Sequence, residues 1–503
     1  MTERAVDRFF IREGYTPRAE PDYFLDACRE TEGTVHQPDA YPFAAHLGQR
    51  FGVGHLIDIG CGRAEKLADF HDDFKLVGID LGGNLAWCRE TYGFGNWIEF
   101  DLESGEDLPL SSEIIADSVV VCSDVIEHLR NPSHLLRVLR NLSQICAAIV
   151  VTTPERDLAR GPIDPGPPEN RSHVREWNLA EFAELLAWAD LPPSFLGLTR
   201  NSDQSPSKKT ILAVIDGLRP EAFPAPPEEF TVTAIMTTFN EGDIIESVVE
   251  HLIMQGVRVH LVDNWSTDDT IDRIRRFRHH GMTTVEKYPP SSPSGTFDWE
   301  NLLRRVEEIA AASDSDWVIH HDADEIRRSP WPGTTLRNSL YRIEACGYNA
   351  VDHTIVEFWP VTDASVRNLE ADLRHFQFGD RPGHFLQIKA WKPQAGPINL
   401  VSSGGHEAEF RGRRVFPYKF LTKHYPIRSQ GHGERKVFRE RMDRWNPDER
   451  DRGWHVQYDH FKPGDSFLKS GEELEVFEER DFNRRCVVER LSGINIPRIE
   501  PGG

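Results

Sequence analysis

The amino-acid sequence predicts two successive doubly wound α/β domains. Short apolar runs alternate with helical patterns between residues 56 and 215, and a second alternation of the same kind begins at residue 231. A polar stretch with four prolines, 216–229, separates the two alternations. We therefore predict a first domain over 1–217, a linker over 218–229, a second domain over 230–434 and a charged, helical C-terminal extension over 435–503.

The bulk composition excludes several kinds of protein. A formal net charge of −23 is opposite to the surplus of Lys and Arg that a polynucleotide-binding protein needs, so no nucleic-acid partner is expected. Seven cysteines without a C-x-x-C pair fit neither a disulfide framework nor a zinc ribbon, which favours a cytoplasmic location. The longest apolar run, 145–151, is too short for a transmembrane segment, and a peripheral position at a membrane stays open.

The predicted strands of the first domain end in residues suited to a nucleotide cofactor. Asp58 and the turn Gly60–Cys61–Gly62 close the first strand, and glycines there let a ligand approach the backbone at a helix start. Asp80 closes the second strand, at the spacing where a carboxylate accepts both hydroxyls of a ribose. The alternative is an ordinary tight turn followed by an exposed strand-end Asp. The predicted strands cover 56–60, 75–80, 118–124, 147–154 and 211–215.

Two further motifs complete this pattern, Phe-Asp-Leu at 100–102 and Cys-Ser-Asp-Val-Ile-Glu-His-Leu at 122–129. With them, residues 40–215 resemble the class I methyltransferases that act on small molecules, which implies a Rossmann-like domain that binds S-adenosylmethionine. By this resemblance the Gly-rich turn holds the methionine part, and Ala64 is a tolerable departure at its third small position. The cofactor-binding residues so implied are Asp58, Gly60, Cys61, Gly62, Asp80, Leu81, Asp101, Leu102, Ser123 and Asp124.

Methyl transfer requires an acceptor lone pair in line with the methyl group, so a base that removes a hydroxyl proton is the main catalytic addition. His128 is the candidate catalytic base, and a packed or capping histidine is an equally weighted alternative. His173 and Trp177 follow the strand at 147–154 and are candidates to line the acceptor pocket. A helix start that docks by its Trp explains these two residues equally well.

In the second domain the predicted strands again end in polar residues. The first ends in Thr-Thr-Phe-Asn-Glu at 237–241, and the second ends in Asp263, with Ser266 in the next turn. An Asp followed by a hydroxyl offers hydrogen-bond acceptors to a pyrimidine and a ribose. Asp268 and Asp269 are better explained as caps of the following helix. The predicted strands lie within 231–241, 257–266, 283–289 and 316–325.

Asp322 and Asp324 follow the last of these strands with an i, i+2 spacing. Two carboxylates placed in this way hold a hard divalent cation, which neutralises a diphosphate leaving group. An isolated D-x-D triplet is more often only an acidic turn. Its position after two nucleotide-binding motifs favours the metal site here.

These motifs, in this order, resemble the family 2 glycosyltransferases of GT-A fold over residues 228–430. The resemblance implies a nucleotide-sugar donor, inversion at the anomeric carbon, and Mn2+ or Mg2+ held by Asp322, Asp324 and His424, with His384 as the second candidate histidine. Glu300 and Asn301 lie on a helix that often contacts the donor in this family. The nucleotide-sugar-binding residues so implied are Thr238, Asn240, Glu241, Asp263, Ser266, Asn301, Asp322 and Ala323.

Inversion also requires a base on the acceptor side. The family's Glu-Asp base motif is missing after Glu325, and His406 and Glu407 are the best local candidates because neighbouring glycines let a ligand approach. Packing or turn roles are the alternative. The cations Arg435, Lys436, Arg439 and Arg441 would attract a diphosphate, although a solvated charged face is the favoured interpretation.

Together these patterns predict a bifunctional transferase of glycan or glycolipid biosynthesis. One domain would transfer a sugar from a nucleotide-sugar donor to a glycan or glycolipid acceptor, and the other would methylate a sugar hydroxyl from S-adenosylmethionine. One alternative is a single active glycosyltransferase with a non-catalytic, methyltransferase-like scaffold domain. A nucleic-acid base-modifying enzyme is the second alternative, and the acidic charge disfavours it.

Overall fold

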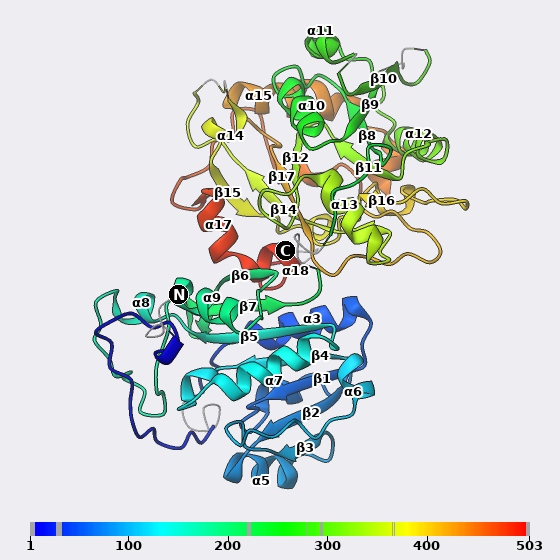
Figure 1. Cartoon of the computed structure of the whole chain (residues 1–503). Coiled ribbons are helices and arrows are strands. Elements are labelled where there is room, and N and C mark those ends of the chain that lie inside the picture. The colour runs from blue at the N-terminus through cyan, green and yellow to red at the C-terminus, as the bar shows by residue number, and fades with distance from the viewer. Residues whose placement is uncertain are drawn as a thin grey trace. The chain divides into compact units, whose positions relative to one another are not determined.

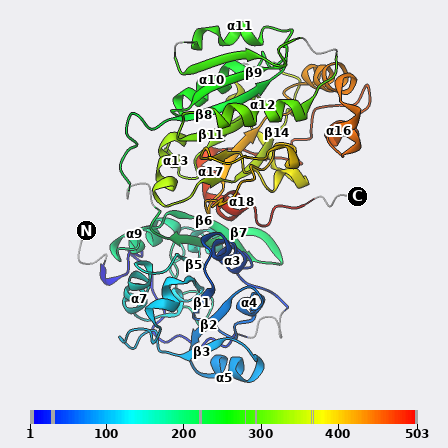
Figure 2. The ribbon, with the colours of Figure 1, turned by 90° about the vertical axis from the view of Figure 1, so that its right-hand side faces the viewer.

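The chain forms two compact units (Figures 1 and 2). Unit 1 comprises Met1–Ala222 and Arg480–Asn495, and unit 2 comprises Phe223–Glu479 and Ile496–Gly503. Residues 480–495, which the sequence pattern assigns to the C-terminal extension, thus lie in unit 1. The computed structural model describes residues 6–26, 33–218, 223–278, 280–291, 295–364, 366 and 368–498.

Unit 1 contains a seven-stranded sheet in the order β3-β2-β1-β4-β5-β7-β6. Strands β1 to β5 are parallel, and β7 is antiparallel to both β5 and β6. The strand order reverses between β1 and β4, the place where doubly wound sheets bind ligands outside their carboxyl ends. The strands are β1 His55–Ile59, β2 Lys75–Asp80, β3 Asn96–Glu99, β4 Ser118–Ser123, β5 Ala148–Pro154, β6 Phe195–Ser202 and β7 Ser205–Ile215.

The core of unit 1 lies between this sheet and its helices. All residues of β4 are buried, as expected for a parallel strand that is covered on both faces. Helix α7 buries Leu135, Leu139 and Leu142, which recur at the helical period along one face. The helices are α3 Ala40–Phe51, α4 Glu65–Ala68, α5 Gly82–Thr91, α6 Ser112–Ala116, α7 Ser133–Ser143, α8 Arg156–Arg160 and α9 Leu179–Trp188, with a short 3-10 turn η1 Ile126–His128.

The C-terminal segment of the chain returns to the edge strand of unit 1. Helices α17 Glu479–Arg485 and α18 Val487–Ser492 end this segment, and α18 contacts β6. A Cβ atom at Gly197 of β6 would lie 2.4 Å from the carbonyl oxygen of Arg484, so the glycine permits the close approach. Asn495 also donates a hydrogen bond to Asp39 at 2.7 Å. Unit 1 is therefore completed by residues far beyond the predicted linker.

Unit 2 contains two sheets. The strand orders are β10-β9-β8-β11-β16-β13 and β12-β17-β14-β15-β18. Strands β8 to β11 are parallel, and their order reverses between β8 and β11. The strands are β8 Val232–Thr238, β9 Arg258–Asp263, β10 Met282–Lys287, β11 Trp317–Asp322, β12 Glu325–Arg328, β13 Ala350–Val351, β14 His353–Phe358, β15 His375–Phe378, β16 Ala390–Trp391, β17 Phe420–His424 and β18 Glu475–Val476.

The charged segment near residue 435 packs into unit 2. It forms a π-helix, Arg435–Arg441, whose Val437 belongs to an apolar cluster with Trp359 and Phe467. The expectation of a solvated face is wrong for Lys436, which is buried. The α-helices of unit 2 are α10 Ile245–Met254, α11 Thr270–Ile274, α12 Trp299–Ala311, α13 Leu336–Ala345, α14 Leu369–Asp372, α15 Gln430–Glu434 and α16 Pro447–Asp451.

Both units have the α/β architecture that the sequence predicts, whereas the GT-A assignment of unit 2 stays a prediction. Within the described ranges, every helix is too short or too polar to cross a lipid bilayer.

Candidate functional site

The first candidate site lies at the carboxyl ends of β1, β2 and β4, where the sheet order of unit 1 reverses. Gly60 and Gly62 have positive φ angles of 77° and 55° in the turn after β1. A Cβ atom at Gly60 would lie 2.4 Å from Cγ2 of Val125, so this position requires glycine. Ala64, at the third small position of the turn, also has a positive φ of 54°.

Asp80 joins this turn to the end of β2. Its carboxylate accepts hydrogen bonds from the backbone N–H groups of Gly62 and Leu81, both at 2.6 Å. Burial raises the pKa of Asp80, although the two N–H groups oppose this shift. The sequence-predicted residues of the turn and the second strand are therefore brought together, with the carboxylate of Asp80 as their common acceptor.

Asp58 is fully buried in β1 below the turn. Its Oδ2 atom accepts a hydrogen bond from the Tyr41 hydroxyl at 2.9 Å, and its buried Oδ1 atom has no partner among the described residues. Burial raises the pKa of Asp58 to about 7, and the nearby Asp80 and Asp26 add to the shift. A ligand with positive charge would stabilise the ionised form of Asp58.

The other predicted cofactor residues of unit 1 have separate surroundings. The Cys61 side chain is buried beside Cys88, and the Cys61 backbone N–H donates to the carbonyl of Ile79 at 3.1 Å. Asp101 follows β3 as an exposed side chain, and its neighbour Leu102 is buried. Ser123, at the end of β4, shares a hydrogen bond of 2.8 Å with Thr152.

Asp124 and His128 follow the carboxyl end of β4, where the sheet order of unit 1 reverses. Asp124 has a positive φ of 55° and accepts a hydrogen bond from Gln37 at 2.9 Å. The Nδ1 atom of His128 donates to the carbonyl of Ser172 at 2.9 Å, which leaves Nε2 with a lone pair. Burial lowers the pKa of His128 to about 4, so the imidazole is neutral at pH 7.

His173 and Trp177 have different surroundings. The His173 ring lies edge-on to the His128 ring, with 4.7 Å between centroids. Trp177 is fully buried, and its indole N–H donates to the carbonyl of Phe9 at 2.9 Å. The structure thus favours the docking interpretation for Trp177.

A segment before the first strand also borders this site, and the sequence analysis missed it. The Tyr23 hydroxyl donates to the carbonyl of Leu81 at 3.0 Å, and the Phe24 ring lies 5.1 Å from the His128 ring. Asp26 lies so close to the turn that a Cβ atom at Gly62 would be 2.5 Å from its Oδ2 atom. Two aromatic rings and an acid within a polar stretch were the only signal in the sequence.

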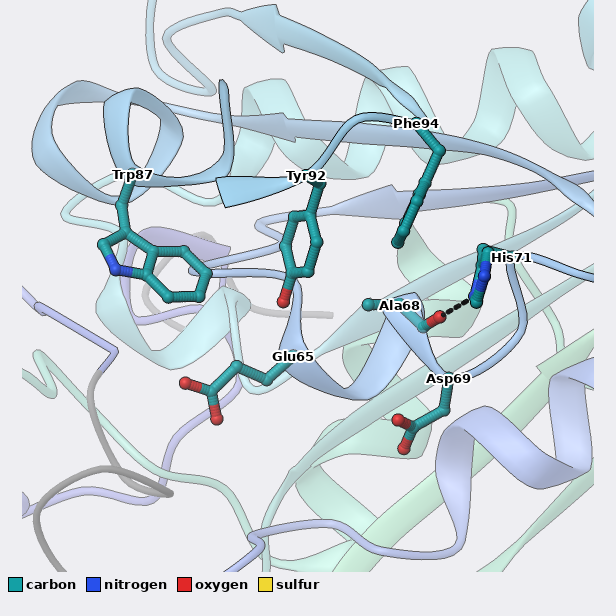
Figure 3. A pocket seen from close by; sticks show the side chains of 7 residues that line it. All are labelled: Glu65, Ala68, Asp69, His71, Trp87, Tyr92 and Phe94. Carbon is teal, nitrogen blue, oxygen red and sulfur yellow. Dashed lines mark hydrogen bonds between the residues drawn. The ribbon is translucent and has the colours of Figure 1, made fainter. Parts of the chain in front are cut away.

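A separate surface recess of unit 1 contains none of the predicted site residues (Figure 3). It lies between α4, α5 and the loop before β3, and the His71 ring stacks on the Phe94 ring with 4.3 Å between centroids. Its lining residues are Glu65, Ala68, Asp69, His71, Trp87, Tyr92 and Phe94.

The second candidate site lies at the carboxyl ends of β8, β9 and β11 in unit 2. The Asn240 N–H donates to the Ser266 hydroxyl at 3.0 Å, and the Ser266 N–H donates to Asp263 at 3.1 Å. Thr238 ends β8 opposite Asp263, and its buried hydroxyl has no partner among the described residues. These four predicted nucleotide-binding residues are adjacent in the structure.

Lysines contact both acids of the predicted metal pair. Lys389 Nζ lies 2.6 Å from Asp322 Oδ2, and Lys436 Nζ lies 2.8 Å from Asp324 Oδ2 and 3.2 Å from Glu241 Oε1. Burial opposes ionisation of these two aspartates, but the lysines outweigh it and hold the pKa of each well below its ordinary value. Ala323, between them, is buried.

His424 lies near Asp324 without closing a metal shell. Its Nε2 atom is 3.7 Å from Asp324, and its Nδ1 atom is 3.5 Å from Glu357. Burial favours the neutral ring, but these two carboxylates outweigh it and raise the pKa of His424 to about 10. Among the described residues, Asp322, Asp324 and His424 do not form a cluster with ligand atoms within 4.8 Å of one another.

The remaining predicted residues of unit 2 have local partners. Asn301 donates to Asp298, the cap of its own helix α12, and Glu300 pairs with Arg304 and Arg452. Asp268 accepts from the N–H groups of Gly242 and Thr270, which agrees with a capping role. Asp269 is the N-cap residue of α11, but its side chain makes no cap hydrogen bond and pairs with Arg273 instead, so the capping prediction is wrong for this residue.

The two predicted bases of unit 2 have different surroundings. His406 accepts from Gln387 at 2.9 Å, and burial lowers its pKa to about 4, with Lys389 as the next cause. The carboxylate of Glu407 is bound to Arg413 at 2.5 Å. His406 is therefore a neutral ring near Lys389, while Glu407 is held in an ion pair. His384, the second candidate histidine for the predicted metal site, has its Nε2 atom 3.8 Å from Oε1 of Glu357.

Comparison with known families supports the assignment of unit 1. Residues 57–145 match the family described as "Methyltransferase domain". The match covers a segment of unit 1 alone, from within β1 to just beyond α7. No curated protein shows significant sequence similarity to the chain.

Several solved structures share a remote likeness with the chain. The O-methyltransferase NcsB1 from neocarzinostatin biosynthesis, solved with S-adenosylmethionine, is 18% identical with a TM-score of 0.26 over 34% of this chain and 51% of that one, about half its length. A SAM dependent methyltransferase from Aquifex aeolicus is 13% identical with a TM-score of 0.28 over 38% and 94% of the two chains. The plantazolicin methyltransferase BpumL is 18% identical with a TM-score of 0.29 over 37% and 86%. Similarities with such low identity and TM-scores carry no argument about the function of this chain.

Proposed function

We propose that unit 1 transfers a methyl group from S-adenosylmethionine to a hydroxyl of a small molecule or sugar. The observation that carries this proposal is the bridge by Asp80, which accepts from Gly62 and Leu81 inside the segment that matches the methyltransferase domain. A carboxylate at the end of the second strand suits the two ribose hydroxyls. Asp58 would receive the ammonium group of the methionine part, and Asp101 with Leu102 would flank the adenine.

The residues of unit 1 would mainly position the reactants. S-adenosylmethionine, when bound, would supply an electrophilic methyl group on a sulfonium, with a thioether as the leaving group. The Gly60–Gly62 turn and Asp80 would fix this group, because in-line geometry provides most of the rate enhancement. The free Nε2 atom of His128 would accept the hydroxyl proton, with Ser172 holding its ring.

Calorimetry on the full chain tests this proposal. Asp80→Ala should weaken S-adenosylmethionine binding by about 100-fold, because it removes the acceptor of two hydrogen bonds to a charged group. Asp73→Ala, an exposed acid of the same unit, is the matched control and should bind normally. Equal affinities of the wild type and Asp80→Ala would refute the proposed cofactor site.

We further propose that unit 2 transfers a sugar from a nucleotide-sugar donor. The specific observation is the convergence of Thr238, Asn240, Asp263 and Ser266 beside the Asp322–Asp324 turn, where the sheet order reverses. His406 is the better candidate base, since Glu407 is held by Arg413. A silent scaffold domain and a nucleic-acid base-modifying enzyme stay the alternatives.

The predicted Mn2+ or Mg2+ does not fit the arrangement of these residues. A metal ion requires open carboxylate oxygens, but an ammonium group already contacts each aspartate. The buried cations Lys389 and Lys436 would instead supply fixed positive charge near the leaving diphosphate.

A thermal-shift screen over nucleotide sugars tests the role of unit 2. A stabilising nucleotide sugar should lose its effect in Asp263→Ala and keep it in Asp80→Ala, because each acid belongs to a different unit. If both units act on one glycan or glycolipid, their linkage raises the effective concentration of the shared intermediate. Absence of any shift over the whole panel would favour the scaffold alternative.

A further inference from the structure

Glu127, His128 and His173 come together beside the proposed methyl-transfer site. One ligand atom from each lies within 4.8 Å of the other two. The backbone fixes this arrangement, because the Val174 N–H donates to the Glu127 carbonyl at 2.7 Å and His128 donates to the Ser172 carbonyl at 2.9 Å. The loop that carries His173 is thus tied to the turn that carries the other two residues.

Both histidines are oriented as metal ligands are. His128 donates its Nδ1–H to a backbone carbonyl, and the Nδ1 atom of His173 lies 2.6 Å from the carboxylate of Glu176. A carbonyl or carboxylate on one ring nitrogen fixes the tautomer and directs the other nitrogen toward a ligand. In His173 this other nitrogen, Nε2, accepts a hydrogen bond from the side-chain amide of Asn170 at 3.0 Å, which a bound cation would have to replace. The carboxylate of Glu176 is itself held by Arg160 at 2.8 Å.

The third residue supplies a buried oxygen that lacks a donor. Glu127 is fully buried, and Thr153 donates to its Oε2 atom at 3.0 Å. Its Oε1 atom has no hydrogen-bond partner among the described residues. A buried acceptor without a donor is costly, so a cation at this point would stabilise the site.

We propose that Glu127, His128 and His173 bind one divalent cation of the borderline class, Zn2+ or Fe2+. Two imidazoles and one carboxylate are the donor set that such ions take in catalytic sites, with the remaining positions open to a substrate oxygen. The role of a substrate oxygen at the open position rests on the proposed methyl transfer, whereas binding of the cation by the three residues does not. With the cation bound, Nε2 of His128 would be a ligand and no longer the acceptor of the hydroxyl proton. The cation would instead lower the pKa of the acceptor hydroxyl, so that its proton passes to water.

The second cluster of this kind provides a control. Glu241, Asp243 and His432 of unit 2 also bring three ligand atoms within 4.8 Å. Arg428 already pairs with both carboxylates, at 2.6 Å and 2.7 Å. We expect no cation there, so His432→Ala removes a buried histidine without touching the proposed site.

Titration of the metal-free full chain with Co2+ and Zn2+, followed by visible absorption and calorimetry, tests the site. We expect one tight ion per chain, a loss of at least about 100-fold in affinity for His128→Ala and His173→Ala, and normal binding for His432→Ala. Glu176→Gln should weaken binding about 10-fold through the orientation of His173. No binding by the wild type, or equal loss in His432→Ala, would overturn the site.

The same samples separate this site from the proposed function. S-adenosylmethionine binding should persist in His173→Ala, which shows that the unit is folded. If the chain binds Co2+ but not S-adenosylmethionine, the metal-site proposal stands and the methyl-transfer proposal is refuted. If the chain binds S-adenosylmethionine but not Co2+, only the metal-site proposal is refuted.

Discussion

The two candidate sites lie at equivalent places in their sheets but stabilise their acids in opposite ways. In unit 1, Asp58 and Glu127 are fully buried, no Lys or Arg side chain in the described ranges bonds to them, and burial raises the pKa of both. In unit 2, Asp322 and Asp324 each contact a lysine, and their pKa values are lowered. Burying an unpaired carboxylate costs much more than burying a paired one.

This difference indicates which ligand charge suits each site. Lys66 lies near Asp58 and partly opposes the rise in its pKa, but no Lys or Arg side chain of the described ranges bonds to Asp58 or Glu127. We therefore infer that unit 1 is suited to a ligand with positive charge. S-adenosylmethionine carries both an ammonium and a sulfonium. Unit 2 contains fixed cations beside its acids, which suits the negative charge of a diphosphate that leaves. Removal of one charge in each unit should therefore have effects of opposite sign on stability.

The largest effect is expected for Lys436→Met in unit 2. It removes the ammonium group that contacts Asp324 and Glu241 and leaves two buried carboxylates with less compensation. We expect a loss of about 3–5 kcal/mol in the free energy of unfolding, measured by denaturant titration. Arg439→Met, an exposed cation of the same π-helix, should change it by less than about 0.5 kcal/mol. Equal effects of the two substitutions would contradict the comparison.

The opposite sign is expected for Asp58→Asn in unit 1. The folded-state pKa of Asp58 is raised from 3.8 to about 7, so ionisation destabilises the fold progressively as the pH rises through this window. At about 1.4 kcal/mol per unit, the gain from an uncharged amide is at most about 4 kcal/mol above pH 7 and vanishes near pH 4. Unfolding of the ligand-free chain at both pH values measures it. A loss of stability at pH 8 would indicate that Asp58 has a cationic partner.

A smaller effect is expected from the backbone of the unit 1 turn. Gly60→Ala combines a positive φ of 77° with a contact of 2.4 Å to Val125, and we expect a loss of about 2–3 kcal/mol. Gly52→Ala has a left-handed φ of 75° and no atom within 4 Å of the added Cβ, so it isolates the conformational cost of about 1 kcal/mol. Thermal unfolding measures both. Equal losses would mean that Val125 moves aside and that the turn is less constrained than its geometry indicates.

The strands and their polar ends could be predicted from the sequence because both are local features. The predicted strand 75–80 coincides with β2, and the acids Asp80, Asp263 and Asp322 each end a strand as expected. Apolar runs and the residues that end them need only neighbours in the chain to be recognised. The α/β architecture follows from these local patterns.

The partners of those acids could not be predicted in the same way. Lys389 and Lys436 are 67 and 112 residues from the aspartates that they contact, and nothing in the local pattern around a lysine indicates a buried ion pair. The same limit applies to His173, which lies beside His128 only through the loop after β5, and to the C-terminal segment at β6. Such contacts depend on the tertiary fold, and they decide which of the predicted sites is open to a cation.

The smallest effect should come from EDTA on unit 2, and the same treatment distinguishes the two sites. Dialysis against EDTA should reduce methyl transfer, because Glu127, His128 and His173 would lose their ion, whereas sugar transfer should change by less than about twofold. The reason is that Lys389 and Lys436 already contact the carboxylates that a metal would need. Both activities are measured on one sample, before and after addition of Zn2+ or Mn2+, with Lys436→Met as the variant that should lose sugar transfer at any metal concentration. Sugar transfer that EDTA abolishes and Mn2+ restores would mean that the lysines move away when the donor binds, and that Asp322 and Asp324 hold the cation that their spacing predicts.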